Sequence, residues 1–356
     1  MNTVYNYSMI MVFRYRVKSL SGLLNEQARK VSFVWNYCND RQKDALRFGR
    51  RWLTGFDLNV LTTGSSKELG LHSGTINAVC EQYAKSREQR KRPFLRYRGR
   101  KASGWVPLKG RDLKCEGDAF RFAGHTFRVF HSRPLPEGKV MDGTNFSRDS
   151  LGHWFLNIVV DVPAADKRVP AREVGIDLGL HDLGKQSDGK RIEAPQFYRN
   201  AEAALALAQR AHKTRRVKAI HAQVARRRRD FLHKETTKLV RQYDLIAVGN
   251  VNASALAQTR LAKSVLDAGW TSFRQMLAYK AVKHGAWFAE VDERFTTQLC
   301  SHCGAKPDAR PKGIAGLGIR EWQCGDCSAF HDRDVNAAIN ILRRGRATLA
   351  AGIPVL

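Results

Sequence analysis

The sequence predicts a multidomain protein that joins an α+β part to an α/β part. Stretches of β-forming residues flank a long helical region in the first half of the chain. In the second half, a buried strand, an amphipathic helix and another buried strand follow one another. Two Cys-x-x-Cys pairs near the C-terminal end indicate a small metal-folded insert. The chain has 356 residues, 43% of them hydrophobic, which is enough for two or three packed domains.

The first half is expected to form a β domain that helices interrupt. Residues 9–17 are rich in β-formers and end in alternating apolar and basic residues, which is typical of a strand. Residues 20–86 place apolar side chains at helical spacing. Short strands are predicted again within residues 120–129 and 154–162. These strands should complete a sheet or barrel that the first strand begins.

The net charge of the chain is strongly positive. Lys and Arg total 61 residues against 33 Asp and Glu, which gives a formal charge of +28. A surface this basic favours a polyanionic partner. The alternative, a membrane surface, is disfavoured because the sequence contains no run of 18 apolar residues. Nucleic acid is therefore the expected partner.

Residues 87–111 mix basic side chains with Phe94, Tyr97 and Trp105. A solvated loop would explain this composition, but the same mixture stacks on bases and pairs with phosphates. Because the whole chain is basic, we expect nucleic-acid contact here. The candidate residues are Arg90, Lys91, Arg92, Arg96, Arg98, Arg100 and Lys101.

Residues 201–242 are predicted to form one long or once-interrupted basic helix. The alternative is a solvated surface helix. However, the consecutive arginines at 226–229 surround one helical turn, so some of them must face a negative partner. We expect this helix to bind a nucleic-acid backbone through Arg215, Arg216, Arg226, Arg227, Arg228 and Arg229.

A second domain is expected to begin near Arg172. Residues 174–179 form a short apolar strand around Asp177, and a carboxylate in a buried strand is costly unless it binds something such as a cation. Residues 245–248 read as a parallel strand buried on both faces, and a helix connects them to the strand 287–291. The two strands should be parallel, with their carboxyl ends at the sheet edge where active residues gather.

The two cysteine pairs are predicted to hold one structural zinc ion. Four thiolates in two tight turns are the usual ligand set of a tetrahedral zinc site. The alternative is a pair of disulfides, but the three other scattered cysteines suit a reducing cytosol better. The expected zinc ligands are Cys300, Cys303, Cys324 and Cys327.

Several of these motifs together resemble one protein family. They are Gly175-Ile176-Asp177-Leu178-Gly179, the Arg-rich helix, Thr296-Thr297-Gln298 before the first cysteine pair, the second pair, and Asp332-Arg333-Asp334-x-Asn336-Ala337-Ala338-x-Asn340-Ile341-Leu342. The second half of the chain thereby resembles TnpB, the transposon-encoded RNA-guided DNA nucleases related to type V CRISPR effectors. The first half resembles this family only in the order of its parts.

The resemblance implies a definite domain order. A wedge-like β-barrel domain and an inserted helical recognition domain would come first, followed by an RNase H-like RuvC nuclease domain with a zinc-bearing insert that binds target nucleic acid. The implied boundaries are 1–19 and 101–168 for the wedge-like domain, 20–100 for the recognition domain, 169–298 and 329–345 for the RuvC domain with its Arg-rich helix at 201–242, 299–328 for the insert, and 346–356 for a C-terminal tail.

The resemblance also implies a RuvC site of three carboxylates. Asp177 matches the first carboxylate. Asp334 matches the third, near a helix N-terminus that favours the ionised form. The second should be a glutamate at the end of the strand 245–248, but Gly249 holds that place. The chain therefore departs from the family pattern at one catalytic position.

Two explanations of Gly249 compete. Either the nuclease is inactive, and the protein is an RNA-guided DNA-binding regulator or relic, or the glutamate has moved, as in a branch of the family. The relocated residue would be Glu293, just past the neighbouring strand, from where a long side chain could reach the space beside Gly249. Glu290 is the weaker candidate because it lies within that strand.

We therefore expect an RNA-guided DNA endonuclease that cleaves next to a short adjacent motif. Asp177, Glu293 and Asp334 would hold two Mg²⁺ ions for phosphodiester hydrolysis. The expected partners are a guide (omega) RNA, with one protein copy on it, and double-stranded target DNA, without a membrane. The bacterial cytoplasm, with the nucleoid, is the expected location. A DNA transposase is disfavoured, because recombination chemistry in such transposons normally belongs to a partner protein.

Overall fold

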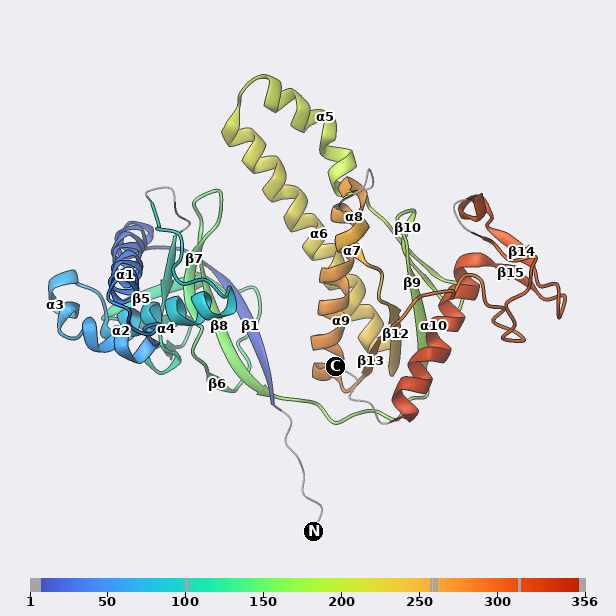
Figure 1. Ribbon diagram of the computed structural model, residues 1–356, viewed down its shortest axis with the longest axis horizontal. Coiled ribbons are helices and arrows are strands. Elements are labelled where there is room, and N and C mark those ends of the chain that lie inside the picture. The colour runs from blue at the N-terminus through green and yellow to red at the C-terminus, as the bar shows by residue number, and fades with distance from the viewer. Residues whose placement is uncertain are drawn as a thin grey trace, which may run out of the picture. The chain divides into compact units, whose positions relative to one another are not determined.

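The computed structural model describes residues 8–99, 102, 104–256, 258, 262–312 and 315–351. The chain divides into two compact units, Met1–Pro163 and Ala164–Leu356 (Figure 1). The multidomain mixed α/β class that the sequence predicts is thus confirmed.

The first unit is built on an antiparallel sheet of eight strands in the order β2-β7-β8-β1-β5-β4-β3, with β6 paired to β8. The long strands β1 (Ser8–Val17) and β8 (Trp154–Pro163) lie at its centre, and alternate side chains of β8 are buried. The other strands are β2 (Trp105–Pro107), β3 (Lys114–Glu116), β4 (Ala119–Phe122), β5 (His125–Phe130), β6 (Lys139–Val140) and β7 (Asn145–Arg148).

The predicted closed β-barrel is wrong for the described residues. The end strands β2 and β3 pair with inner strands of the sheet but not with each other. Each has only three residues, so neither offers a hydrogen-bonding edge long enough to close a barrel. The strands form an open sheet instead.

The helices of the first unit lie in the region where helical spacing was predicted. They are α1 (Ser21–Arg47), α2 (Gly55–Leu61), α3 (Ser65–Leu69) and α4 (Ser73–Gln89), with the short 3-10 helix η1 (Gly110–Asp112) between strands. The buried side chains of α1 and α4, such as Val31, Trp35 and Tyr83, join those of the sheet in one apolar core. Burial of this apolar face is what holds the helices in place.

The second unit contains a five-stranded sheet in the order β11-β10-β9-β12-β13. Its strands are β9 (Glu173–Leu178), β10 (Asp182–Gln186), β11 (Arg191–Glu193), β12 (Leu245–Gly249) and β13 (Trp287–Val291). The strands β12 and β13 are parallel, as predicted, and β9 is also parallel to β12, while β10 is antiparallel to both of its neighbours. The carboxyl ends of the three parallel strands therefore share one edge.

The helices of the second unit are α5 (Phe197–Arg210), α6 (Thr214–Gln242), α7 (Ala253–Leu256), α8 (Ala262–Ala268), α9 (Trp270–His284) and α10 (Arg333–Ala350). The predicted basic helix is once interrupted, because α5 and α6 form a helical hairpin (Figure 1). The 3-10 helix η2 (Ala315–Gly318) and β14 (Glu321–Gln323) lie in the cysteine-bearing insert, and β14 pairs with β15 (Phe330–Asp332), which directly follows the insert. They complete the second unit.

The two faces of this sheet carry side chains of different size. On one face, Ile176, Ile246 and Phe288 pack with large side chains of α6 and α9. On the other face, α10 lies directly on small residues, because Gly175 and Ala247 leave room for its backbone. This close approach brings the N-terminus of α10 to the carboxyl edge of the sheet.

The close packing of α10 predicts that Gly175→Ala destabilises the second unit. An added Cβ would lie 2.0 Å from the Ala338 carbonyl oxygen and 2.7 Å from the Leu342 nitrogen, so the helix would have to move. Overpacking of this kind commonly costs about 1–3 kcal/mol. Urea denaturation should show this loss, whereas Gly318→Ala, with no atom within 4 Å of the new methyl, should leave the free energy of unfolding unchanged. Equal stability of the two variants would contradict the prediction.

Candidate active site and metal centre

The three predicted catalytic carboxylates line one cleft of about 660 Å³ at the carboxyl edge of the second sheet. Asp177 lies near the end of β9, Glu293 follows β13, and Asp334 lies in the first turn of α10. The structure thus brings together three residues that are far apart in the sequence. Their part in catalysis stays a prediction.

Strand periodicity explains the position of Asp177. Residues that alternate along β9 share a face, so Asp177 lies on the same face as Gly175, against which α10 packs. Asp334 reaches this face because α10 begins there, with Asp332 as its N-cap. The Asp332 carboxylate accepts hydrogen bonds from the backbone nitrogens of Asp334 (3.0 Å) and Val335 (2.8 Å). The helix start is therefore well defined.

The Glu293 side chain lies beside Gly249. A Cβ added to Gly249 would lie 2.8 Å from the Glu293 carboxylate and 3.2 Å from its Cβ. The absence of a side chain at Gly249 is therefore what leaves room for Glu293. The loop after β13 is held by hydrogen bonds from the Glu293 nitrogen to Asn250 (3.3 Å) and from the Thr296 hydroxyl to the Glu293 carbonyl (2.8 Å).

Glu290 is placed differently. Its carboxylate forms an ion pair with Arg274 at 3.3 Å, and it is not among the described residues that line the cleft. Arg274 also donates hydrogen bonds to the carbonyls of Gly249 (3.4 Å) and Val251 (3.1 Å). Glu290 therefore neutralises an arginine that braces the end of β12.

The cleft disfavours negative charge unless a cation is bound. Burial, together with the charges of Asp334 and Glu293, raises the pKa of Asp177 to about 8. Burial also raises the pKa of Glu293, against the opposing influence of Arg274. Clustered carboxylates such as Asp177, Glu293 and Asp334 supply the oxygen ligands that Mg²⁺ prefers. The donor set therefore fits a divalent cation.

Two arginines contact Asp334. Arg320, from the cysteine-bearing insert, lies 2.8 Å from one carboxylate oxygen, and Arg333 lies 3.0 Å from the other. Both arginines also line the cleft. These contacts fix the Asp334 carboxylate from two sides and bring positive charge to the cleft wall.

The four predicted metal ligands lie together. The sulfurs of Cys300, Cys303, Cys324 and Cys327 are all within 4.8 Å of one another, and these residues could hold a metal such as zinc. The sulfurs of Cys300 and Cys327 are 3.6 Å apart, and those of Cys303 and Cys324 are 3.8 Å apart. A disulfide bond is about 2.05 Å long, so the disulfide alternative does not describe this cluster.

Each cysteine pair forms the same kind of turn. The Cys300 nitrogen donates to the Ala305 carbonyl at 2.9 Å, and the Cys324 nitrogen donates to the Ala329 carbonyl at the same distance. Gly304 and Ser328 follow the second cysteine of each pair with left-handed φ angles of 79° and 58°. Glycine adopts this conformation readily, whereas a serine does so only in a well-held turn.

Sequence reasoning missed a role for His331. This buried histidine lies with its Nε2 3.0 Å from the Cys300 sulfur and packs on Trp322, with ring centroids 4.8 Å apart. Asp332 follows it directly in the sequence, and Asp334 comes after Arg333. His331 thus connects the cysteine cluster to the start of α10. Its position just after the second cysteine pair is the sequence feature that could have indicated this role.

Asn336 and Asn340 were noted only as parts of a motif, but they join α10 to the segment between Glu293 and the cysteines. The Ser301 nitrogen donates to the Asn336 side chain at 2.8 Å. Both asparagine amides donate to the carbonyls of Thr296 and Leu299, at 2.8–3.1 Å. Both side chains are buried, so these bonds hold the segment firmly.

The predicted nucleic-acid residues of the first unit differ in exposure. Arg90, Lys91, Arg92 and Arg96 are exposed, and Arg100 and Lys101 lie outside the described residues. Arg98 is held between Trp35 and Trp105, at 3.8 and 4.7 Å from their ring centroids, and burial lowers its pKa to about 10. Together with Arg90, Arg96 and Lys109 it lines a cavity of about 840 Å³.

On α6, the predicted residues Arg215, Arg216, Arg226, Arg227 and Arg229 are exposed. Arg228 is turned toward the protein, where its guanidinium donates to the Leu266 carbonyl and lies 3.8 Å from the Asp267 carboxylate. The arginine run thus divides between an outer and an inner face.

Within the described residues, no helix has the length and hydrophobicity needed to span a bilayer.

Two protein families match consecutive parts of the chain. Residues 157–260 match the family described as "Probable transposase", and residues 270–341 match the "Cas12f1-like, TNB domain". A "Putative RNA-guided DNA endonuclease" of Streptomyces pristinaespiralis is 37% identical over 235 residues, which are 62% of this chain and 57% of that protein. InsQ of Escherichia coli K12, with the same description, is 30% identical over 57% of this chain and 56% of its own length.

The chain therefore spans a little over half the length of these curated relatives. A solved complex of Cas12f1 with sgRNA and target DNA has a similar fold, with a TM-score of 0.60 at 12% sequence identity. This similarity covers 90% of the present chain and 82% of the Cas12f1 chain. The two proteins share their fold over most of the sequence.

The buried asparagine contacts predict that Asn336→Ala lowers the free energy of unfolding. Asn340 would still serve the Thr296 and Leu299 carbonyls, but the Ser301 nitrogen would lose its acceptor. Loss of this partly buried hydrogen bond costs about 0.5–1.5 kcal/mol. Urea denaturation should show this loss relative to Asn200→Ala, which removes an exposed hydrogen bond to Pro195. Equal losses in the two variants would contradict the prediction.

Proposed function

We propose that this chain is an RNA-guided DNA endonuclease of a transposon, and the resemblance to the TnpB family, the family matches and the similar fold of Cas12f1 support this proposal. The observation that carries the proposal is the cleft in which Asp177, Glu293 and Asp334 meet, with Glu293 in the space beside Gly249. The guide RNA and double-stranded target DNA would be its partners, and the charge of +28 supports a polyanionic partner.

We assign the second unit to an RNase H-like RuvC nuclease domain. Its sheet, with β9, β12 and β13 parallel and β10 antiparallel, supports this assignment. The cysteine-bearing segment would be its target-nucleic-acid-binding insert. The open sheet and the helices of the first unit would correspond to the wedge-like and recognition domains.

Asp177, Glu293 and Asp334 would hold two catalytic Mg²⁺ ions. When bound, these ions supply an activated water and stabilise the leaving 3′ oxygen of the phosphodiester. Burial and the neighbouring carboxylates raise the pKa of Asp177 to about 8, so Asp177 would release a proton as it becomes a ligand. Arg320 and Arg333 orient Asp334, and the exposed arginines of α6 would hold the nucleic-acid backbone.

The second candidate function is an RNA-guided DNA-binding protein that does not cleave. The observation in its favour is Gly249, which replaces the expected glutamate. Guided binding without cutting, in the presence of Mg²⁺, is the result that would establish this function.

Relocation of the glutamate predicts that Glu293→Ala abolishes cutting. With its co-expressed RNA, a matched double-stranded target and Mg²⁺, the wild-type chain should cut, and the variant should be at least about a hundredfold slower, since metal-ion stabilisation is worth several kcal/mol. Target binding should persist, which a binding assay in Ca²⁺ would measure. Glu290→Ala, the matched control, should cut at the wild-type rate because Glu290 pairs with Arg274 outside the cleft.

A double variant sharpens this test. Gly249→Glu combined with Glu293→Ala would return the carboxylate to the end of β12, and some cutting should recover. If Glu293→Ala cuts normally, the catalytic assignment of Glu293 is wrong. If wild type binds the guided target but never cuts, the endonuclease proposal gives way to the second candidate.

We also propose that the four cysteines hold one structural Zn²⁺. Zinc binding in small modules contributes roughly 10–16 kcal/mol of apparent folding free energy, so a chelator should unfold the insert. Metal analysis should find one zinc per chain, and limited proteolysis after chelation should cut within residues 299–328. Cys303→Ser should lose zinc and become sensitive to the protease within the same residues. Cys115→Ser, which changes another exposed cysteine, should retain zinc. Zinc-free protein with a protected insert would contradict the proposal.

A further inference from the structure

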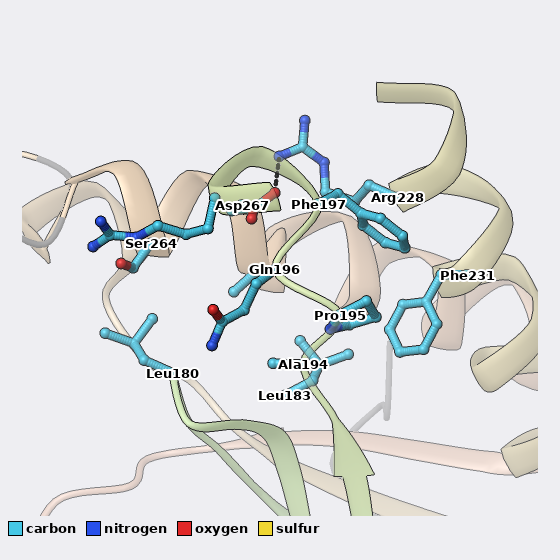
Figure 2. A pocket seen from close by; sticks show the side chains of 12 residues that line it. Leu180, Leu183, Ala194, Pro195, Gln196, Phe197, Arg228, Phe231, Ser264 and Asp267 are labelled. Atoms are coloured by element: carbon cyan, nitrogen blue, oxygen red, sulfur yellow. Dashed lines mark ion pairs between the residues drawn. The ribbon is translucent and has the colours of Figure 1, made fainter. Parts of the chain in front are cut away.

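A second cavity, of about 320 Å³, lies beside the carboxylate cleft. Leu180 lines both spaces, so the two adjoin each other. The cavity is formed where the β9–β10 connection, the segment before α5, and the helices α6 and α8 meet (Figure 2). The residues that line it include Leu180, Pro195, Phe197, Arg228, Phe231 and Asp267. Its volume is at the lower end of the range of small-molecule sites, about 300–1,000 Å³.

The walls of this cavity are mostly apolar. Phe197 and Phe231 meet edge to face, with ring centroids 6.0 Å apart, and Leu180 and Pro195 contribute further apolar surface. Figure 2 shows Asp267 and the Arg228 guanidinium at one end and the side chain of Leu180 at the other. A flat group with a polar edge would suit such walls.

The polar end contains a buried acceptor in need of a donor. Asp267 exposes only 6% of its side chain. One carboxylate oxygen accepts a hydrogen bond from the Tyr198 nitrogen at 2.8 Å, but the other has no hydrogen-bond partner among the described residues. Arg228 lies 3.8 Å from that oxygen, beyond hydrogen-bond distance. An unsatisfied buried carboxylate oxygen is costly, so a ligand that donates an N–H would be stabilised here.

We propose that this cavity receives one unpaired nucleobase of the nucleic-acid strand that passes along the carboxylate cleft. The proposal rests on the proposed function, because it takes nucleic acid as the partner. The edge of a nucleobase places an N–H donor beside an acceptor atom, which complements the free Asp267 oxygen and the neighbouring Arg228 guanidinium. The base would lie against Phe197 and Phe231, and every base can stack in this way.

The position of the cavity explains how such a base would act. A base withdrawn from its neighbours and held at Leu180 anchors its strand next to the cleft. The backbone on the adjoining nucleotide then passes the carboxylates with less freedom, which favours the in-line geometry of hydrolysis. The cavity would thus position the strand, and it would read little sequence.

The test uses 2-aminopurine, whose fluorescence rises when the base leaves the stack of its neighbours. The chain, bound to its RNA and a matched DNA target in Ca²⁺, is scanned with the probe at single positions of the unpaired DNA strand. Single-stranded oligonucleotides with the same probe are titrated with the chain alone. We expect a clear rise at one position, and its loss in Ala268→Phe, which fills the cavity.

Two further variants distinguish a loss of base binding from a folding defect. Asp267→Asn keeps an acceptor for the Tyr198 nitrogen but removes the negative charge. The apparent affinity for the probe base, measured by 2-aminopurine fluorescence, should fall about tenfold in this variant. The control Asp230→Asn removes an exposed carboxylate on α6 that pairs with Lys234, and it should bind the probe base like wild type. Urea denaturation of each variant would reveal a general loss of stability.

The outcomes distinguish this proposal from the endonuclease proposal. If no position responds, or if Ala268→Phe gives the wild-type signal while remaining folded, the base site is overturned even where guided cutting is intact. If guided binding and cutting both fail, the endonuclease proposal is overturned, and the single-strand titration still decides whether the cavity binds a base.

Discussion

The second unit depends on one packing contact, the close approach of α10 to the face of the sheet that carries Gly175 and Ala247. A helix can lie this near to strands only where side chains are absent or small, and the opposite face, with its larger side chains, packs against α6 and α9. The contact places the first turn of α10 at the carboxyl ends of the parallel strands. Asp177 and Asp334 meet for this reason.

The same geometry gives Gly249 a physical meaning. A side chain at this position would collide with Glu293. A glycine there leaves room for the Glu293 side chain, which reaches the site from just past the neighbouring strand β13. Burial, together with the charges of Asp334 and Glu293, raises the pKa of Asp177, so the three carboxylates are electrostatically coupled. In such a unit the chain position of each carboxylate matters less than the point in space that its oxygens reach.

The cysteine-bearing insert and the cleft are physically joined. His331 contacts a cysteine sulfur just before α10 begins, and Asn336 and Asn340 hold the segment that leads from Glu293 to the first cysteine pair. Arg320 of the insert contacts Asp334 directly. A metal bound by the four cysteines would therefore also help to order the cleft, without taking part in its chemistry.

Local patterns in the sequence determined the long strands of the first unit, the buried strands of the second, the interrupted basic helix and the cysteine cluster, whereas the resemblance to a family implied that Glu293 could replace a residue at Gly249. These features depend on periodicity and spacing, which neighbouring residues carry. The open sheet in place of a barrel, the inward turn of Arg228, the holding of Arg98 between two tryptophans and the cavity at Asp267 were decided by the tertiary structure alone. Each depends on contacts between segments distant in the chain, whose packing and desolvation no local pattern encodes.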